Sequence, residues 1–192
     1  MKEIVLATNN EHKLKEFKEI LPNYKIISLE DIGYTDDIEE TGTTFQENAK
    51  IKADTIHNYL VEKKEKKLVV ADDSGCCCVA LNNKPGIYSA RYAGNHDFQA
   101  NRDKLRKDLK GKSRDAFFCC CICLEDEDGN TQFFEGKTEG EIIDEERGSK
   151  GFGYDSIFFS KDLQKTFGEA TEEEKNSVSH RKRAIEQLKK AL

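Results

Sequence analysis

The chain has 192 residues, of which 36% are hydrophobic and 35% are charged, and its formal net charge is −6 at pH 7. This composition is typical of one globular domain with a sizeable core, so we expect residues 1–192 to form a single domain. The negative charge argues against binding of nucleic acid or of an anionic membrane through bulk electrostatics, because both are themselves anionic.

The same sequence predicts a cytoplasmic protein. No apolar run approaches the ~20 residues of a membrane helix, and the first residues, MKEIVLATNN, are too weakly apolar for a signal peptide. Thiols stay reduced in the cytoplasm. Since the seven cysteines are also odd in number and clustered in two short runs, we expect no disulfide framework.

Strand and helix patterns alternate in the first third of the chain. Residues 2–7 (KEIVLA) are typical of a buried strand, and residues 11–21 of a helix with one apolar face. A second helix is predicted over residues 43–59, with Thr44 as its N-cap and Glu47 completing a capping box.

The middle and end of the chain predict further strands and a final helix. Strands are expected at residues 68–71 and 76–81, separated by Asp-Asp-Ser-Gly, which has a turn composition. The other predicted elements are a helix at 97–109, strands at 116–124 and 131–135 joined by a hairpin turn, strands near 140–143 and 156–159, and a helix from about Ser179. This order indicates an α/β fold, a mixed sheet with flanking helices.

A polar segment joins the first predicted strand to the first predicted helix. It consists of Thr8, Asn9, Asn10, Glu11, His12 and Lys13. A helix N-terminus presents free N–H groups and the positive end of the dipole, so it favours phosphate. Lys13 would add a full charge, and Thr8 and Asn10 would add hydrogen bonds. The alternative is a plain helix cap with a solvent-exposed lysine.

Carboxylates gather in two places, at Glu40 and Glu47 and at Asp72 and Asp73. A few carboxylates completed by waters and substrate phosphates are the usual ligands of Mg²⁺. Because neighbouring side chains point oppositely in an extended segment, at most one of Asp72 and Asp73 is expected to face a given metal. The alternative is a turn with local Asx hydrogen bonds.

Two polar motifs lie near the C-terminus. In Lys150-Gly-Phe-Gly-Tyr-Asp155, two glycines let the backbone approach a flat ligand on which Phe152 or Tyr154 would stack; the alternative is a hairpin loop with a core aromatic. In the second motif, residues 175–181, Ser177 or Ser179 caps the last helix, and His180 and Arg181 follow in its first turn. Cations there oppose the helix dipole, which an anionic ligand would explain; the alternative is a charged surface helix.

The cysteines, in Cys76-Cys77-Cys78 and Cys119-Cys120-Cys121 with Cys123, lie inside the most strand-like runs. Neighbours in a strand alternate faces, whereas structural zinc favours spaced pairs in loops. We therefore interpret them as small core hydrophobes rather than as a zinc or iron–sulfur site.

Taken together and in this order, the motifs resemble the inosine triphosphate pyrophosphatase family, also called XTP/dITP diphosphatases, over nearly the whole chain. The motifs that carry the resemblance are Thr8-Asn-Asn with Lys13, Glu40-Thr-Gly-Thr-Thr-Phe with Glu47-Asn-Ala, Ala71-Asp-Asp-Ser-Gly, Pro85-Gly-Ile-Tyr-Ser-Ala-Arg-Tyr-Ala-Gly, Gly151-Phe-Gly-Tyr-Asp, and Glu174-Lys-Asn leading to Ser179-His-Arg.

The resemblance implies an elongated mixed sheet, two lobes around a central substrate cleft, and a homodimer. It implies hydrolysis of deaminated purine nucleoside triphosphates, such as ITP, dITP and XTP, to the monophosphate and pyrophosphate. Glu40 and Asp73 would hold Mg²⁺, and Asp73 would also be the catalytic residue that orients or deprotonates water. The implied substrate-binding residues are Thr8, Asn9, Asn10, Glu11, His12, Lys13, Ser74, Phe152, Gly153, Tyr154, Asp155, Lys175, His180 and Arg181.

Two positions depart from the family pattern. Cys76 replaces an apolar residue, and Ser156 replaces a proline, which predicts a less constrained loop after Asp155. Two other functions stay open: a related pyrophosphatase that prefers another base, as in dTTP, and a cysteine-based metal or redox module.

Overall fold

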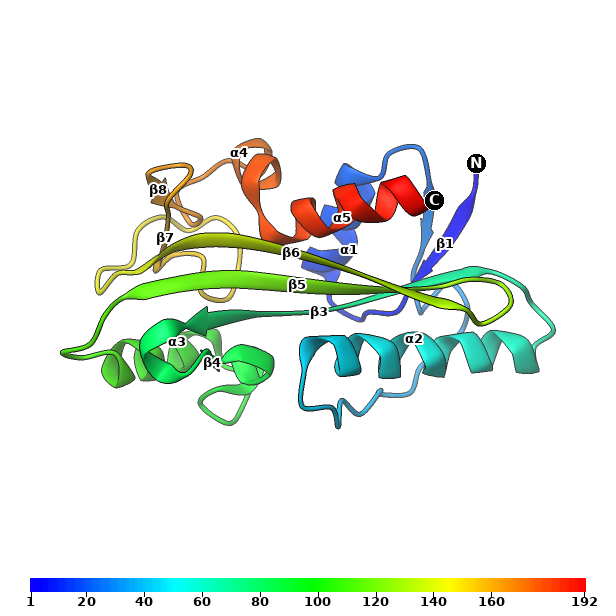
Figure 1. Ribbon diagram of the computed structural model, residues 1–192, viewed down its shortest axis with the longest axis horizontal. Helices are drawn as coiled ribbons and strands as arrows, with labels where there is room; N and C mark the ends of the chain where they lie inside the picture. Colours follow the sequence, from blue (N-terminus) through cyan, green and yellow to red (C-terminus); the bar gives the residue numbers. More distant parts are fainter. The chain divides into compact units, whose positions relative to one another are not determined.

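The structure, a computed structural model, describes residues 1–192, and it contains one mixed eight-stranded sheet with flanking helices (Figure 1). The strand order is β2-β1-β3-β5-β6-β7-β8, and β4 pairs with β3. The strands are β1 (Glu3–Leu6), β2 (Lys25–Ile27), β3 (Leu68–Cys78), β4 (Lys84–Pro85), β5 (Asp115–Glu125), β6 (Thr131–Ile142), β7 (Phe158–Ser160) and β8 (Lys165–Thr166). The helices are α1 (Glu11–Ile20), α2 (Phe45–Glu62), α3 (Phe98–Asp108), α4 (Glu172–Val178) and α5 (His180–Ala191). The predicted α/β fold with a mixed sheet is confirmed.

The residues of the chain gather in two compact units. Unit 1 comprises Met1–Asp73, Cys121–Glu135 and Ala184–Leu192, and unit 2 comprises Ser74–Cys120 and Gly136–Arg183. None of the helices is both long and apolar enough to cross a membrane.

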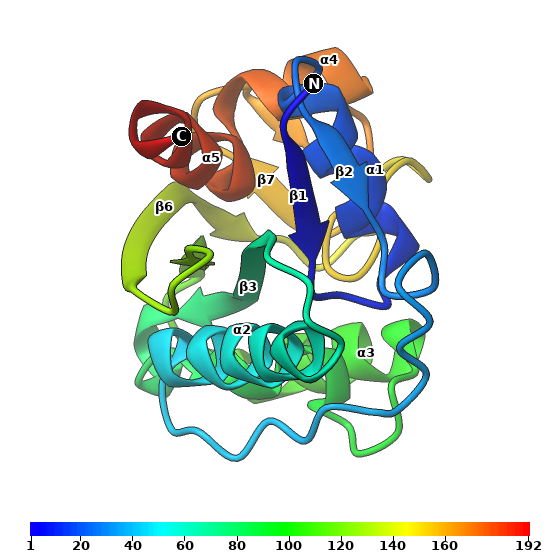
Figure 2. The same cartoon turned by 90° about the vertical axis from the view of Figure 1, so that its right-hand side faces the viewer.

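In unit 1, β1 lies parallel to both β2 and β3 (Figure 2). Ile4 pairs with Ile26 of β2 and with Leu68 of β3. Beyond these pairs, the backbone N–H of Ala7 donates to the carbonyl oxygen of Val70 at 2.8 Å. The residues that follow β1 therefore lie beside Ala71 and Asp72 of β3, at the carboxyl end of β1. Ligands of α/β proteins bind at the carboxyl ends of parallel strands.

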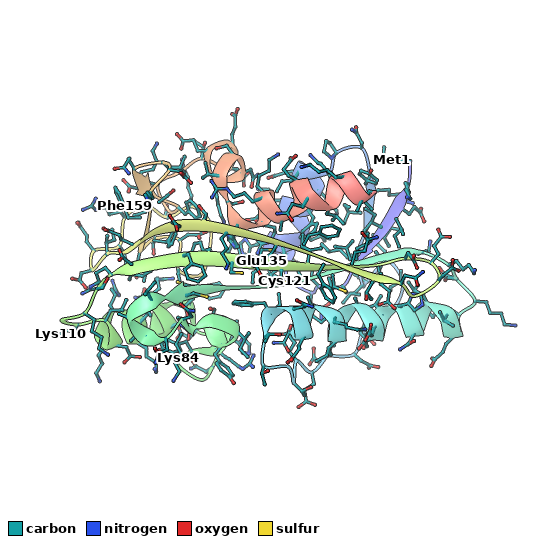
Figure 3. The ribbon with its side chains drawn as sticks, in the orientation of Figure 1. Met1, Lys84, Lys110, Cys121, Glu135 and Phe159 are labelled. Atoms are coloured by element: carbon teal, nitrogen blue, oxygen red, sulfur yellow. The ribbon has the colours of Figure 1, made fainter.

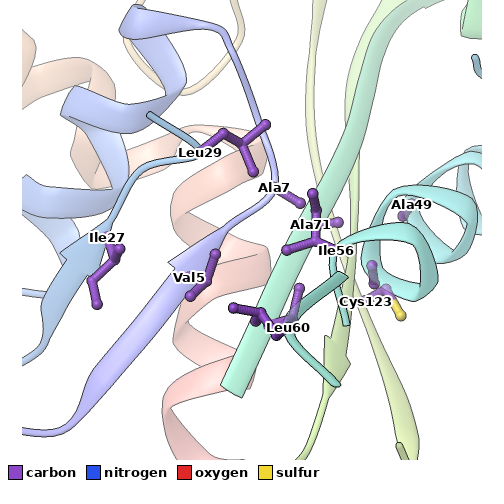
Figure 4. Close-up of a cluster of buried hydrophobic side chains, with 11 residues drawn as sticks. Val5, Ala7, Ile27, Leu29, Ala49, Ile56, Leu60, Ala71 and Cys123 are labelled. Atoms are coloured by element: carbon purple, nitrogen blue, oxygen red, sulfur yellow. The ribbon is translucent and has the colours of Figure 1, made fainter. Parts of the chain in front are cut away.

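One face of α2 is buried against β1 and β3 in unit 1 (Figure 4). The buried cluster is formed by Val5, Ala7, Ile27, Leu29, Ala49, Ala53, Ile56, Leu60, Val69, Ala71 and Cys123. Its α2 members recur at intervals of three or four residues, which places them on one side of the helix. Two polar residues, Asn48 and Lys52, share this buried side, and both lie next to the acidic pair of β3.

Unit 2 has an aromatic core. Phe118 of β5 stacks on Phe158 of β7 with 4.1 Å between ring centroids, and Phe167 lies 5.1 Å from Phe158. The core also contains Cys76, Cys78, Leu105, Leu109, Ala116, Ile142, Tyr154 and Ile157. Leu105 of α3 and Leu109, which follows the helix, are fully buried, so α3 is fixed to this core.

The turn predicted at residues 72–75 is wrong, because β3 runs without interruption from Leu68 to Cys78. Asp72 and Asp73 are buried in this strand. Backbone groups in a buried segment must be hydrogen-bonded, and pairing of β3 with β1 and β5 satisfies them better than a turn would. Pairing in the sheet has overridden the local preference of Asp, Ser and Gly for turns.

The separate strands predicted at 131–135 and 140–143 are also one strand, β6. Burial alternates through its middle, where Gly136 and Thr138 are buried and Lys137 is exposed, so the strand period continues across the glycine. The strand predicted near 156–159 is shifted to β7. The short β2, β4 and β8 and helix α4 were not predicted, because two to seven residues carry little periodicity.

Candidate functional site

The polar segment after β1 forms the N-terminal cap of α1. The side-chain oxygen of Asn10 accepts the backbone N–H groups of His12 at 2.9 Å and Lys13 at 3.2 Å, and the Thr8 hydroxyl accepts the N–H of Asn10 at 3.1 Å. The helix cap is therefore confirmed, whereas the solvent-exposed lysine of that alternative is wrong. Asn9, Glu11 and His12 are exposed at this turn. Phosphate binding by the segment stays a prediction.

The side chain of Lys13 does not extend into solvent, because its ammonium group lies 3.0 Å from the carboxylate of Asp72. This ion pair is largely buried, with 14% of the lysine side chain and none of the aspartate side chain exposed. It joins the first turn of α1 to β3, as the parallel pairing of β1 and β3 allows. A positive charge is thereby held beyond the carboxyl end of β1, beside the interior of β3.

Asp73 has different partners from Asp72, as expected for neighbours in a strand. Its Oδ2 accepts a hydrogen bond at 3.2 Å from the side-chain amide of Asn48 on α2. The oxygen of the same amide accepts the backbone N–H of Gly42 at 2.8 Å. Asn48 therefore fixes the segment that carries Glu40 relative to Asp73.

Gly42 is required for this arrangement. A Cβ atom at this position would lie 2.6 Å from the side-chain oxygen of Asn48 and 2.7 Å from the Cβ of Glu47. Thr44 caps α2, as predicted, by accepting the N–H of Glu47 at 3.1 Å. The carboxylate of Glu47 accepts the N–H and hydroxyl groups of Thr43, at 2.6 and 3.0 Å. The Glu47 side chain thus holds the loop before α2.

Lys52 is a central residue of the site that the sequence analysis missed. Its ammonium group donates to the carbonyl oxygen of Asp72 at 2.5 Å and lies 2.7 Å from Oε1 of Glu40. Burial opposes its charge, but Asp72, Asp73 and Glu40 outweigh that cost and raise the pKa of Lys52. The sequence did contain a signal for Lys52: it lies one turn after Asn48, and both are polar residues on the otherwise apolar side of α2.

The carboxyl group of Asp73 is poised to exchange a proton. Burial raises its pKa to about 6, and Glu40 acts in the same direction, whereas Lys52 and Lys13 lower it. Asp73 is 5% exposed. A carboxylate with a pKa near neutrality accepts protons more effectively than an ordinary one and also gains most from a nearby cation.

The donor types in this part of unit 1 fit a hard divalent cation. Asp73 and Glu40 supply carboxylate oxygens, and their mutual repulsion, seen in the effect of Glu40 on the pKa of Asp73, would be relieved by a cation. No group of three or more His, Cys, Asp or Glu side chains converges as a metal site in residues 1–192. Two protein carboxylates fit Mg²⁺, which keeps several waters and binds substrate phosphates, better than ions that need a complete protein cage.

In unit 2, the Gly-Phe-Gly-Tyr-Asp motif forms a loop held by the carboxylate of Asp155. Its Oδ2 accepts the N–H of Phe152 at 3.0 Å and lies 3.0 Å from the ammonium group of Lys175. Gly151 has φ +73°, and a Cβ there would collide with this carboxylate. Gly153 also has positive φ, +62°. Both glycines therefore allow conformations that other residues rarely adopt.

The two aromatic residues of the loop differ in exposure. Tyr154 is part of the core of unit 2, and its hydroxyl donates to the carbonyl oxygen of Ser89 at 2.6 Å. Burial raises its pKa. Tyr154 is therefore the core aromatic residue that the alternative interpretation of this motif predicts. Phe152 is half-buried, and the ammonium group of Lys175 lies 5.1 Å from its ring centroid. Of the two, Phe152 is the better placed to stack on a flat ligand.

The motif before α5 is buried rather than on a charged surface. Lys175, His180 and Arg181 are 7%, 6% and 2% exposed, and the ring of His180 lies 5.0 Å from that of Phe118. Ser179 is the cap, since its hydroxyl accepts the N–H of Lys182 at 3.1 Å. The surface-helix alternative is therefore wrong. Ser74, which follows Asp73 in β3, is half-buried.

All seven cysteines are free thiols with 0–3% exposure. Cys123 belongs to the core of unit 1, whereas Cys76 and Cys78 belong to that of unit 2; Cys121 lies in the middle of β5 (Figure 3). Burial raises the pKa of Cys121 to about 11 and that of Cys123 to about 12. These are properties of packing residues, and they confirm the interpretation of the cysteines as small core residues.

The fold and the site define an α/β protein whose carboxylates and buried lysines gather near the carboxyl end of β1 and in the interior of the parallel strand β3. Comparisons with known proteins agree with this class. The model of the Ham1 family matches residues 4–191. A protein of Clostridium perfringens named dITP/XTP pyrophosphatase is 47% identical over 199 residues, covering 100% of this chain and 98% of that protein. A protein of the same name from Bacillus subtilis is 48% identical over 198 residues, with the same coverage of each chain.

Solved structures give the same result. The Staphylococcus aureus Ham1 protein superposes with a TM-score of 0.87 at 43% identity, covering 98% of this chain and 97% of that one. A HAM1 protein from Coxiella burnetii has a TM-score of 0.86 at 41% identity, covering 100% and 98%. The chain belongs to the Ham1 family.

Proposed function

We propose that this protein is a nucleoside triphosphate pyrophosphohydrolase that converts deaminated purine nucleotides, such as ITP, dITP and XTP, to the monophosphate and pyrophosphate. The names of the C. perfringens and B. subtilis relatives support the reaction and the substrate class. The observation that carries the proposal is the buried carboxyl group of Asp73, which Asn48 holds by a hydrogen bond of 3.2 Å and which lies in the same buried network as the ion pair of Glu40 with Lys52.

The substrate phosphates would bind at the N-terminus of α1. The free N–H groups of the first turn and the positive end of the helix dipole attract them, and Lys13 adds a full charge, with Thr8 and Asn10 holding the turn in place. Asn9, Glu11 and His12 lie on the exposed side of this turn. Lys13 would exchange its contact with Asp72 for the triphosphate.

Asp73 and Glu40 would hold Mg²⁺. The bound ion would neutralise phosphate charge and favour in-line attack by water. Asn48 orients the carboxyl group of Asp73 through its amide, and Lys52 keeps Glu40 and the backbone at Asp72 in position. Asp73 would also orient the attacking water or accept its proton at the carboxylate.

The base would be bordered by the loop of unit 2 from Phe152 to Asp155. Phe152 offers a half-buried ring for stacking, and the glycines bring the backbone close. Lys175, His180, Arg181 and Ser74 would contact the substrate through polar atoms. A 6-oxo purine differs from adenine in presenting an acceptor where adenine presents a donor, so donors in this region would select it. The homodimer and the cytoplasmic location remain predictions.

The test is pyrophosphate release from ITP, with and without Mg²⁺, by the wild type, Asp73→Asn and Asp128→Asn. Asp128 carries the same chemical change at a position with 76% of the side chain exposed. We expect a loss of at least about 100-fold for Asp73→Asn, as for removal of a general base, and no loss for Asp128→Asn. Full activity of Asp73→Asn would refute its role. Equal rates on ITP, ATP and dTTP would refute the substrate class and favour a pyrophosphatase of different base preference.

A further inference from the structure

Helix α3 of unit 2 contacts the loop that contains Phe152, in addition to the contacts that Asp155 makes within the loop. The guanidinium of Arg102 donates from Nη1 to the carbonyl oxygen of Gly153 at 2.7 Å. This is a charge-assisted hydrogen bond to the middle of the loop, from a side chain that is 16% exposed.

The guanidinium of Arg102 is itself fixed on its other edges. Its Nε donates to Oε1 of Glu146 at 2.7 Å, and its Nη2 donates to the side-chain oxygen of Gln99 at 2.9 Å. Arg102 holds the pKa of Glu146 below its usual range, so the partner is an anion at neutral pH. Because guanidinium is planar, these bonds also set the direction of the Nη1–H group.

The loop needs an external support at Gly153. Nothing lies within 4 Å of the position that a Cβ of Gly153 would occupy, so side-chain packing does not fix this residue. Phe152 is flanked by Phe98, the first residue of α3, at 6.2 Å between ring centroids. The first turns of α3 thus contact both the ring of Phe152 and the carbonyl group that follows it.

We propose that Arg102 is a positioning residue for the base-binding loop, which sets the place of the Phe152 ring by anchoring the Gly153 carbonyl group to α3. The inference rests on the proposed function, in which this loop borders the base. The hydrogen bonds of Arg102 go to Gly153, Glu146 and Gln99 and none goes to Asp73, so its contribution belongs to substrate binding rather than to the chemical step.

Arg106 provides a matched control on the same helix. It lies one turn later, is 20% exposed, contacts the same carboxylate of Glu146 at 3.5 Å, and donates to the carbonyl oxygen of Asp144 at 2.8 Å. It makes no contact with residues 151–155 among its hydrogen bonds and ion pairs. Arg102→Ala and Arg106→Ala therefore both remove a positive charge and a hydrogen bond to a backbone carbonyl group. Only Arg102→Ala also removes a contact with the loop.

The experiment measures kcat and KM for ITP, the inhibition constant of inorganic tripolyphosphate, and hydrogen exchange of a peptide covering residues 150–156, for the wild type, Arg102→Ala and Arg106→Ala. For Arg102→Ala we expect a roughly tenfold higher KM, typical of a lost charge-assisted hydrogen bond, and a kcat within about twofold. The tripolyphosphate constant should not change, because that inhibitor has no base. Exchange in 150–156 should accelerate for Arg102→Ala and not for Arg106→Ala.

Arg102→Lys should give an intermediate KM, because an ammonium group reaches Gly153 or Glu146 but does not bridge them as a planar fork does; it also carries the test if Arg102→Ala fails to fold. An unchanged KM, or equal effects on KM, kcat and the tripolyphosphate constant, would overturn the inference. If the wild type released no pyrophosphate from ITP, the proposed function would fail, and the exchange data alone would decide whether Arg102 orders the loop.

Discussion

Replacing Asp73 with asparagine should stabilise the metal-free protein at pH 8. Burial raises the pKa of Asp73 from 3.8 to about 6, so between these values the folded state binds a proton that the unfolded state does not. The contribution of Asp73 to stability is therefore greatest below pH 3.8 and is lost as pH rises through about 6. Asparagine is neutral at every pH and avoids this loss.

The size of the effect follows from the pKa. A pKa shift of one unit corresponds to about 1.36 kcal/mol. The shift of Asp73 from 3.8 to about 6 therefore lowers the unfolding free energy of the wild type at pH 8 by about 3 kcal/mol. The attraction of Lys52 and Lys13 for the carboxylate is already included, because both lower the pKa. Asn48 retains an acceptor, since the amide oxygen of asparagine can replace Oδ2. At pH 4 the gain should be below about 1 kcal/mol.

Urea unfolding of the wild type, Asp73→Asn and the exposed control Asp128→Asn, at pH 4 and pH 8 with a chelator present, measures these differences. Added Mg²⁺ at pH 8 should stabilise the wild type more than Asp73→Asn, because a ligand of the folded state shifts the equilibrium by mass action. The reasoning would be refuted if Asp73→Asn gave the same change at both pH values, or if it were less stable than the wild type at pH 8.

Three further predictions concern other buried groups. Lys52→Met should lower the unfolding free energy by about 3–5 kcal/mol in urea unfolding, because it leaves buried carboxylates uncompensated. Lys50→Met breaks a partly exposed pair with Asp54 and should cost about 1 kcal/mol or less; equal losses would contradict the buried network. Glu125→Gln should raise the Tm relative to the wild type more at pH 8 than at pH 5. Burial and Asp54 raise the pKa of Glu125 to about 7, so the wild type loses the contribution of this group to stability as pH rises through that value. A difference in Tm that did not depend on pH would contradict this prediction. A thiol reagent such as DTNB should label less than one cysteine per folded chain within minutes at pH 8 and all seven in urea, so that rapid stoichiometric labelling of the folded protein would show a reactive thiol.

The sequence by itself determined the elements whose signals are local. The apolar face of α1, the cap of α2 at Thr44 and the central strand β5 were all predicted to within a few residues, because spacing and capping side chains act over one or two turns. The cysteines were predicted as core residues from their place in strand-like runs, from strand alternation and from the absence of the spacing that structural zinc prefers. The motif order was also sufficient to indicate the family.

The tertiary structure decided where the charges are. The acidic pair lies in a continuous strand because β1 and β5 pair with it, and Lys52 became part of the site because α2 packs with that face inward. Arg102 acquired its contact because α3 lies against a loop about fifty residues later in the chain. Burial, and with it the pKa of Asp73, depends on atoms contributed by distant segments. A local sequence pattern does not contain the positions of these distant atoms, because desolvation and charge interactions act through space rather than along the chain.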